Sequence, residues 1–80
     1  MSSVIKTPLP GTFYRRPSPD AQPYVGEGDT VAVGDVVGLI EIMKTFHEIR
    51  SDTQGVVSRF LVENEQLVDA GQDIIALEPS

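Results

Sequence analysis

The 80-residue sequence contains no cysteine and a single histidine, His47. Without cysteine the chain cannot form disulfides, iron–sulfur clusters or thiolate zinc sites. One histidine also excludes any site that needs two or more, so we expect no metal site. No apolar run approaches the length of a membrane span, and Met1-Ser2-Ser3 does not begin an apolar signal region. These absences predict a soluble, cytoplasmic domain with no membrane partner.

Positive charge is also scarce, because six Lys and Arg residues face twelve Asp and Glu residues and the net charge is −6. The basic residues are scattered along the chain, whereas binding to phosphate backbones needs clustered positive charge. We therefore expect no nucleic-acid partner. The negative field suits a protein partner with a basic docking face, although solubility alone is an equally good explanation.

Branched residues are abundant, and glycines recur at short intervals between them. Such side chains pack well on a pleated surface and lose rotamer freedom in helices. Strands are predicted at residues 4–7, 12–15, 31–32, 36–42, 45–50, 56–63 and 74–78, with a further loop and strand within residues 61–70. No stretch keeps a helical period, so the predicted class is all-β, a sandwich or barrel forming one domain over residues 1–80.

Three prolines, Pro17, Pro19 and Pro23, fall within residues 15–24. Proline has no backbone donor and cannot sit inside a strand ladder. This segment is therefore predicted to leave the sheet as a protruding loop.

The sequence also contains an internal repeat. A shift of 37 residues aligns four identical pairs, which are Val25 with Val62, Val31 with Val68, Gly34 with Gly71 and Glu41 with Glu78. Before the proline-rich loop, Gly11 aligns with Gly55 at a shift of 44. The difference, 44 minus 37, is an insertion of seven residues in the first half. The chain is therefore predicted to contain two similar β units, one of which carries the loop.

The repeat places the junction between the units just after Glu41. There we expect a hairpin over residues 36–50, with Met43-Lys44 as its two-residue turn. The expected cross-strand pairs are Ile42 with Thr45, Ile40 with His47, Gly38 with Ile49, Leu39 with Glu48 and Val37 with Arg50. Such a turn needs positive φ and favours Asn-Gly. Met-Lys breaks that rule, which is typical of a functional site, and Lys44 is one of only two lysines.

Two segments carry a resemblance to a known family. Glu41-Ile42-Met43-Lys44-Thr45 resembles the Glu-Ala-Met-Lys-Met attachment motif of the biotinyl/lipoyl-attachment domain family. The segment Gly11-Thr12-Phe13-Tyr14-Arg15-Arg16-Pro17-Ser18-Pro19-Asp20 resembles the "thumb" found in biotin carboxyl carriers of acetyl-CoA carboxylases. Ile42 and Thr45 depart from the motif, and these departures would either slow recognition by the biotin ligase or tune docking to a particular carboxylase.

The resemblance implies a flattened β-barrel of two four-stranded sheets with a pseudo-twofold axis and a thumb at residues 15–24. It also implies biotin on Lys44 through an amide bond, with Met43 beside it and no catalytic residue. The thumb candidates for contact with the biotin ring are Ser18, Pro19, Asp20 and Ala21, with Thr12 and Tyr14 at the base of the loop.

The implied partners are biotin protein ligase, biotin carboxylase and carboxyltransferase, acting in the cytoplasm or in a plastid stroma. Acetyl-CoA is the default substrate of the assembly, which would serve fatty acid biosynthesis.

Three other functions remain open. A lipoyl carrier has the same architecture, but its tip is usually Asp-Lys-Ala and it lacks a thumb. An unmodified interaction module would explain the departures at Ile42 and Thr45. An enzyme with a Schiff-base lysine would need a desolvating pocket around Lys44, and the sequence offers none that is obvious.

Overall fold

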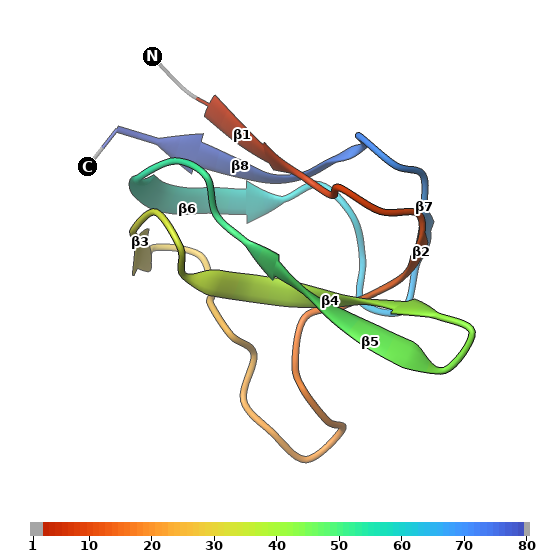
Figure 1. The fold of residues 1–80 in the computed structure, drawn as a ribbon. Helices are drawn as coiled ribbons and strands as arrows, with labels where there is room; N and C mark the ends of the chain where they lie inside the picture. Colours follow the sequence, from red (N-terminus) through yellow and green to blue (C-terminus); the bar gives the residue numbers. More distant parts are fainter. Residues whose placement is uncertain (1–2, 80) are drawn as a thin grey trace.

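The computed structural model describes residues 3–79 as two antiparallel sheets that face each other (Figure 1). The eight strands are β1 (Ser3–Lys6), β2 (Gly11–Tyr14), β3 (Thr30–Val31), β4 (Val36–Ile42), β5 (Thr45–Arg50), β6 (Gly55–Phe60), β7 (Leu67–Val68) and β8 (Asp73–Glu78). One sheet has the order β1-β8-β6-β3 and the other β5-β4-β2-β7. The predicted all-β fold of two four-stranded sheets is confirmed. None of the described residues lies in a helix long and apolar enough to cross a bilayer.

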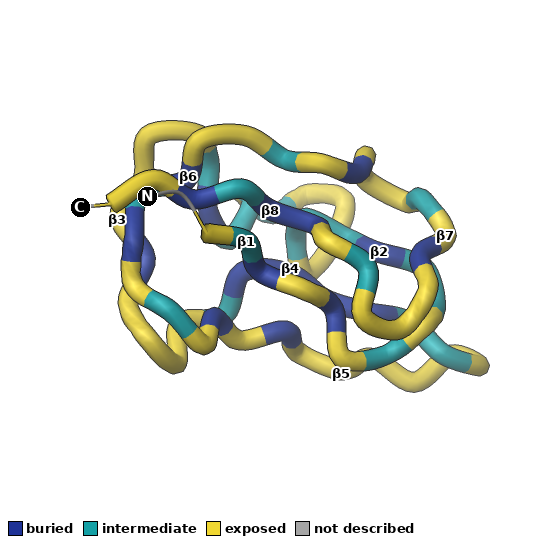
Figure 2. Tube along the Cα trace, turned by 90° about the horizontal axis from the view of Figure 1, so that it is seen from above, coloured by how far each residue is buried: buried dark blue, intermediate teal, exposed yellow. Residues whose placement is uncertain are grey.

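The core lies between the two sheets and is built almost entirely from branched side chains. Alternate residues of a strand point to opposite faces, and β6 accordingly buries every second residue at its start. β4 instead buries the four consecutive residues 37–40, and β8 buries both Ile74 and Ile75. Phe13 is the one aromatic ring among the buried side chains, and Ile40 and Leu77 are equally inaccessible to solvent. Figure 2 shows buried segments on strands of both sheets and mostly exposed residues in the connections.

The sequence repeat is present in the strand register. Gly38 pairs with Ile49 across β4 and β5, and Ile75 pairs with Ile5 across β8 and β1. Gly38 and Ile75 are 37 residues apart, and Ile5 and Ile49 are 44 residues apart, as the repeat requires. Both strand pairs also carry a register shift at the equivalent place. The pseudo-twofold relation between the two halves is therefore confirmed at the level of individual backbone pairs.

The turns repeat as well as the strands. The backbone N–H of Gly26 donates to the Asp29 carboxylate over 2.8 Å, and that of Glu63 donates to the Gln66 side-chain carbonyl over 2.9 Å. Asp29 and Gln66 are again 37 residues apart. Because a carboxylate and an amide both offer an acceptor at this position, the two halves keep one turn with different side chains.

Several details of the predicted secondary structure were wrong. β1 covers Ser3–Lys6 rather than residues 4–7, and β3 covers Thr30–Val31 rather than residues 31–32. β6 ends at Phe60 rather than residue 63, because Glu63 begins the turn that the Gln66 side chain closes. β2 ends at Tyr14, because the N–H of Arg15 donates to the Asn64 side chain instead of a neighbouring strand.

A further error concerns the hairpin register. Arg50 pairs with Val36 and not with Val37, because the register shifts between Val36 and Gly38. Such a shift lets one strand place an extra residue against its neighbour, and Val37 is fully buried in the core.

Candidate functional site: the Lys44 hairpin and the adjacent groove

Met43 and Lys44 form the turn between β4 and β5. Their φ angles are 49° and 65°, and Ile42 pairs with Thr45 on either side. Two consecutive positive φ values are typical of the hairpin turn that normally contains Asn-Gly. For residues with a Cβ this conformation costs about 1–2 kcal/mol each. The predicted turn is confirmed, and local strain is located at the lysine.

The tip of this hairpin is open to solvent. The Met43 side chain is 92% exposed, and Lys44 is also exposed. Among residues 3–79, Lys44 makes no hydrogen bond or ion pair. Its amine is therefore available to another macromolecule, while Lys6 is paired with Asp73.

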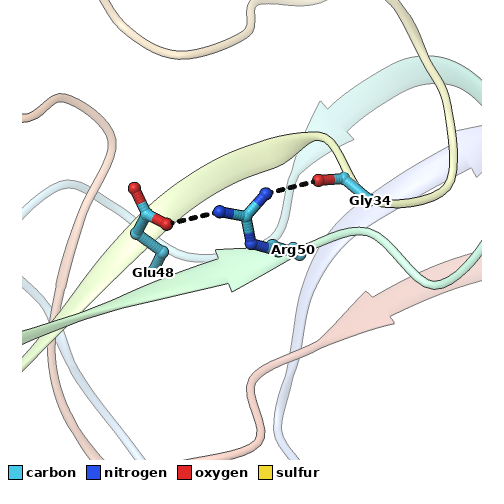
Figure 3. Close-up of polar contacts among 3 residues, drawn as sticks. All are labelled: Gly34, Glu48 and Arg50. Atoms are coloured by element: carbon cyan, nitrogen blue, oxygen red, sulfur yellow. Dashed lines mark hydrogen bonds and ion pairs between the residues drawn. The ribbon is translucent and has the colours of Figure 1, made fainter.

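The base of the hairpin is fixed to the body of the domain. The Arg50 guanidinium donates to a Glu48 carboxylate oxygen over 2.7 Å and to the Gly34 carbonyl over 2.9 Å (Figure 3). The Gly34 N–H donates to the Ser51 carbonyl over 2.8 Å. Ile49, one residue before Arg50, is buried in the core. The hairpin thus combines an anchored base with a solvated tip.

The proline-rich loop projects from the body on the side of β4 and β5 (Figure 1). The Tyr24 N–H closes its base by donating to the Arg15 carbonyl over 3.0 Å. At its tip, the Ala21 N–H donates to the Ser18 carbonyl over 3.1 Å. These bonds and the three prolines restrict the backbone of this segment, which we call the thumb (residues 15–24).

A groove of about 240 Å³ lies between the thumb and the hairpin. Its lining residues come from the thumb, from β2 and β5, and from the turn before β7, and they are Tyr14, Arg16, Pro17, Ser18, Pro19, Phe46, Asn64 and Glu65. The rings of Tyr14 and Phe46 have centroids 6.1 Å apart and are tilted by 57°. Phe46 is 57% exposed although it is a large apolar side chain. The groove thus has aromatic residues on one side and proline on the other.

A hydrogen bond holds one of the two rings in place. The Tyr14 O–H donates to a Glu41 carboxylate oxygen over 2.9 Å, and Glu41 pairs with Phe46 across β4 and β5. This bond raises the pKa of Tyr14, with smaller contributions from burial and from the charges of Glu41 and Glu65. Burial, followed by the charge of Glu48, raises the pKa of Tyr24 at the end of the thumb.

The structure brings some of the expected site residues together and separates others. Ser18 and Pro19 line the groove, whereas Asp20, Ala21 and Met43 do not. Sequence reasoning missed the contribution of Arg16, Phe46, Asn64 and Glu65 to the groove. A signal for Phe46 was present, since it is an apolar residue two positions after Lys44 on a strand. Nothing in the sequence indicated that Asn64 and Glu65 approach the thumb.

The part of the chain that the structure describes contains no group of three or more His, Asp or Glu side chains placed to hold a metal ion. His47 is exposed and pairs with Ile40 across the hairpin, as the register predicted.

Two facing four-stranded sheets with a lysine at an exposed hairpin tip define the biotinyl/lipoyl class of domain. The family model described as "Biotin-requiring enzyme" matches residues 3–77, and the chain belongs to this family. The fold also matches the urea carboxylase of Kluyveromyces lactis with a TM-score of 0.76 and 27% identity, covering 98% of this chain and 6% of that one.

Curated relatives share a similar level of identity. The biotin carboxyl carrier protein of acetyl-CoA carboxylase from Haemophilus influenzae is 37% identical over 75 residues, which is 94% of this chain and 48% of the relative. The corresponding protein of Porphyra purpurea is 37% identical over 76 residues, which is 95% of this chain and 48% of the relative. The chain therefore spans about half the length of these relatives.

Proposed function

We propose that Lys44 carries covalently attached biotin and that the chain is the carrier of a biotin-dependent acyl-CoA carboxylase. In this role it moves a carboxyl group between biotin carboxylase and carboxyltransferase, with acetyl-CoA as the first candidate substrate. The observation that carries the proposal is the strained, solvent-exposed Met43-Lys44 turn in a domain of a biotin-requiring family. The likeness to carriers of acetyl-CoA carboxylase supports the choice of substrate.

The residues around the turn fit a biotin ring. The groove volume of about 240 Å³ lies just below the roughly 300–1,000 Å³ typical of drug-sized ligands, which suits a small bicyclic ring. Phe46 lies two strand residues from Lys44, about 7 Å along β5, and the lysine stem with biotin's acyl chain is longer than that. We propose that Ser18 and Pro19 contact the ring and that Asp20, Ala21 and Met43 flank its path.

The chain's own residues would bind and position the arm rather than catalyse. Bound biotin supplies the carboxyl-carrying chemistry, and the protein supplies position and reach. A tethered ring reaches each active site at a high effective concentration that the length of the arm determines. Because Lys44 has no partner within residues 3–79 that could take its proton, we propose that biotin protein ligase provides the groups that activate the amine.

We also propose a compartment for this activity. The acidic chain, with a net charge of −6, would act in the cytoplasm or, in a plastid-bearing organism, in the plastid stroma. Relatives from Arabidopsis thaliana carry a chloroplastic label.

The test is the intact mass of the protein after coexpression with a biotin protein ligase. We expect one added biotin, lost in Lys44→Arg and retained in Lys6→Arg, the matched control on β1. Biotin on Lys6 would overturn the proposal. A mass increase with lipoyl ligase alone would assign a lipoyl carrier, and no added mass with either ligase would assign an unmodified interaction module.

A further inference from the structure

Two consecutive arginines begin the thumb and have different surroundings. The Arg15 guanidinium lies over the Phe60 ring, with Cζ 3.8 Å from the ring centroid, and the Arg15 N–H donates to Asn64. Arg16 instead lines the groove beside Ser18 and Pro19. Arg15 therefore has a structural role at the base of the thumb, whereas no contact in the structure explains Arg16.

The Nε atoms of Arg15 and Arg16 are both buried and have no hydrogen-bond partner within residues 3–79. Only Arg16 lines the groove, whereas the Arg15 guanidinium lies over the Phe60 ring. A buried donor of a charged group that has lost its water is unfavourable until an acceptor replaces that water. The groove is where an acceptor can enter, because Arg16 forms part of its wall. The site is therefore a donor that lacks an acceptor in a groove next to the candidate attachment lysine.

A guanidinium prefers a specific kind of acceptor. Its N–H groups form a planar fork that matches a carboxylate through two parallel hydrogen bonds, and these charge-assisted bonds are about twice as strong as neutral ones. The ureido oxygen of a biotin ring is a single, uncharged acceptor, so it cannot form the paired contact between opposite charges that a carboxylate forms with the fork. Of the acceptors that a biotin arm can bring to the groove, the carboxylate cargo is the better match.

We propose that Arg16 binds the carboxylate that the arm transports while the ring lies in the groove, and that it thereby retains the cargo in transit. This inference rests on the proposed attachment of biotin to Lys44. Premature loss of the cargo breaks the bond between the ring nitrogen and the carboxyl carbon. Carbon dioxide leaves, and the electron pair stays on the nitrogen, which takes a proton from water. A cation on the carboxylate oxygens opposes this loss, because it stabilises charge that the reaction removes from them.

A second charged residue of the groove acts in the opposite direction. Glu65 also lines the groove, and it makes no ion pair with Arg16 in the described structure. Its carboxylate repels an anionic cargo, so its removal is expected to favour retention. Arg16 and Glu65 thus provide two variants with opposite predicted effects in one groove.

The experiment uses the full chain, biotinylated and then carboxylated with labelled bicarbonate, ATP and a biotin carboxylase that is afterwards removed. The lifetime of the label is measured in the wild type, Arg16→Gln, Glu65→Gln and the charge-matched control Arg59→Gln, whose side chain is exposed on β6. We expect Arg16→Gln to shorten the lifetime by about tenfold and Glu65→Gln to lengthen it. Arg59→Gln should stay within a factor of about two.

A second measurement separates the two possible acceptors. The Nε–H signal of Arg16 is followed by NMR in the unmodified, biotinylated and carboxylated protein. A shift that appears only on carboxylation supports the inference. A complete shift on biotinylation, no shift at all, or equal label lifetimes in Arg16→Gln and Arg59→Gln would overturn it. Absence of biotin on Lys44 overturns the proposed function instead, so the two failures can be distinguished.

Discussion

The two halves of the domain differ most where the thumb leaves the sheet. In the first half, twelve residue steps separate Phe13 from Val25, whereas in the second half five steps separate the equivalent Val57 from Val62. Both connections nevertheless start from equivalent hydrogen bonds. The N–H of Phe13 donates to the Gln66 carbonyl and the N–H of Val57 donates to the Asp29 carbonyl, each over 2.8 Å. The same β framework therefore accepts or omits seven residues without a change in its pairing.

A second difference concerns the ends of the sheets. Strands β4 and β5 have the same register as β8 and β1, with Ile40 opposite His47 and Leu77 opposite Ser3. Of these two strand pairs, only β4 and β5 are joined by a turn, because β1 is the first strand of the described chain and β8 the last. The repeat thus supplies one closed tip, and that tip carries Met43 and Lys44. A symmetric framework has become a domain with one candidate attachment site and one thumb.

The largest effect is expected from core positions that the halves share. Ile40 and Leu77 are equivalent and fully buried. Ile40→Asp or Leu77→Asp should each abolish folding, because an unpaired buried charge costs several kcal/mol, about the stability of a small domain. Circular dichroism melts would measure this. Val33→Asp, at a side chain that is 69% exposed, is the control and should change stability by less than about 0.5 kcal/mol.

A contradicting result would be that one of the two aspartate variants unfolds only half of the structure. Such a result would mean that the halves are separate cooperative units rather than two sheets sharing one core.

A smaller effect is expected from the equivalent glycines Gly11 and Gly55. An added Cβ would lie 2.5 Å from the Glu41 carbonyl oxygen at Gly11 and 2.8 Å from the Glu78 carbonyl oxygen at Gly55. Gly11 also has a φ of 148°. Both alanine variants should lose about 1–3 kcal/mol through overpacking, and Gly11→Ala should lose about 1 kcal/mol more through backbone strain.

Urea denaturation would rank these glycine variants. Gly34→Ala is the control for strain alone, because an added Cβ there meets nothing within 4 Å. Equal losses for Gly11→Ala and Gly55→Ala would show that the backbone at Gly11 relaxes and that the halves are more alike than their φ angles indicate.

Removal of the thumb should change stability little and function strongly. Deletion of residues 17–23 gives the first half the connection length of the second half. We expect the free energy of unfolding to stay within about 1 kcal/mol and the proposed biotinylation of Lys44 to persist. The proposed carboxyl transfer should slow by about tenfold or more, because the ring is no longer positioned. Melting curves, intact mass and the transfer rate would measure the three quantities.

A loop of equal length separates the role of the thumb from that of chain length. Replacement of residues 17–23 by seven Gly and Ser residues keeps the length but removes Ser18 and Pro19 from the groove. It should transfer carboxyl groups as slowly as the deletion. A loss of folding in the deletion variant would contradict the equivalence of the two halves.

The framework was predictable because it is encoded in local patterns. Identical valines, glycines and a glutamate at equivalent positions revealed the repeat, and the repeat predicted the Met43-Lys44 turn and most of its register. The shift between Val36 and Gly38 could not be predicted, because one extra residue in a ladder leaves no trace in the alternation.

The groove was less predictable because it depends on contacts distant in sequence. The Asn64 side chain accepts a hydrogen bond from the N–H of Arg15, 49 positions earlier. Glu65 has a φ of 68°, where the equivalent Gly28 has 91°. A glycine at position 65 would have indicated a tight turn in the sequence, whereas glutamate concealed it. Pattern reasoning therefore identified the thumb but missed the turn before β7 that also lines the groove.

The smallest predicted effect concerns a hydrogen bond that only the first half has. Tyr14 corresponds to Ser58 in the second half, and its O–H donates to Glu41 over 2.9 Å. That bond raises the pKa of Tyr14, so the protonated phenol is favoured in the folded state. Its contribution to stability is complete below the ordinary tyrosine pKa of about 10 and is lost as the pH rises through the higher folded value.

Phenolate absorbance during an alkaline titration would measure this effect, with Tyr24→Phe isolating the signal of Tyr14. Glu41→Ala in that background should lower the pKa of Tyr14 toward its ordinary value, because it removes both the acceptor and the neighbouring charge. In the Tyr14→Phe background the same change should leave the pKa of Tyr24 unaltered, because that pKa is raised by burial and Glu48. Equal shifts of both tyrosines would mean that Glu41 acts through general unfolding, and the local bond would then not distinguish the two halves.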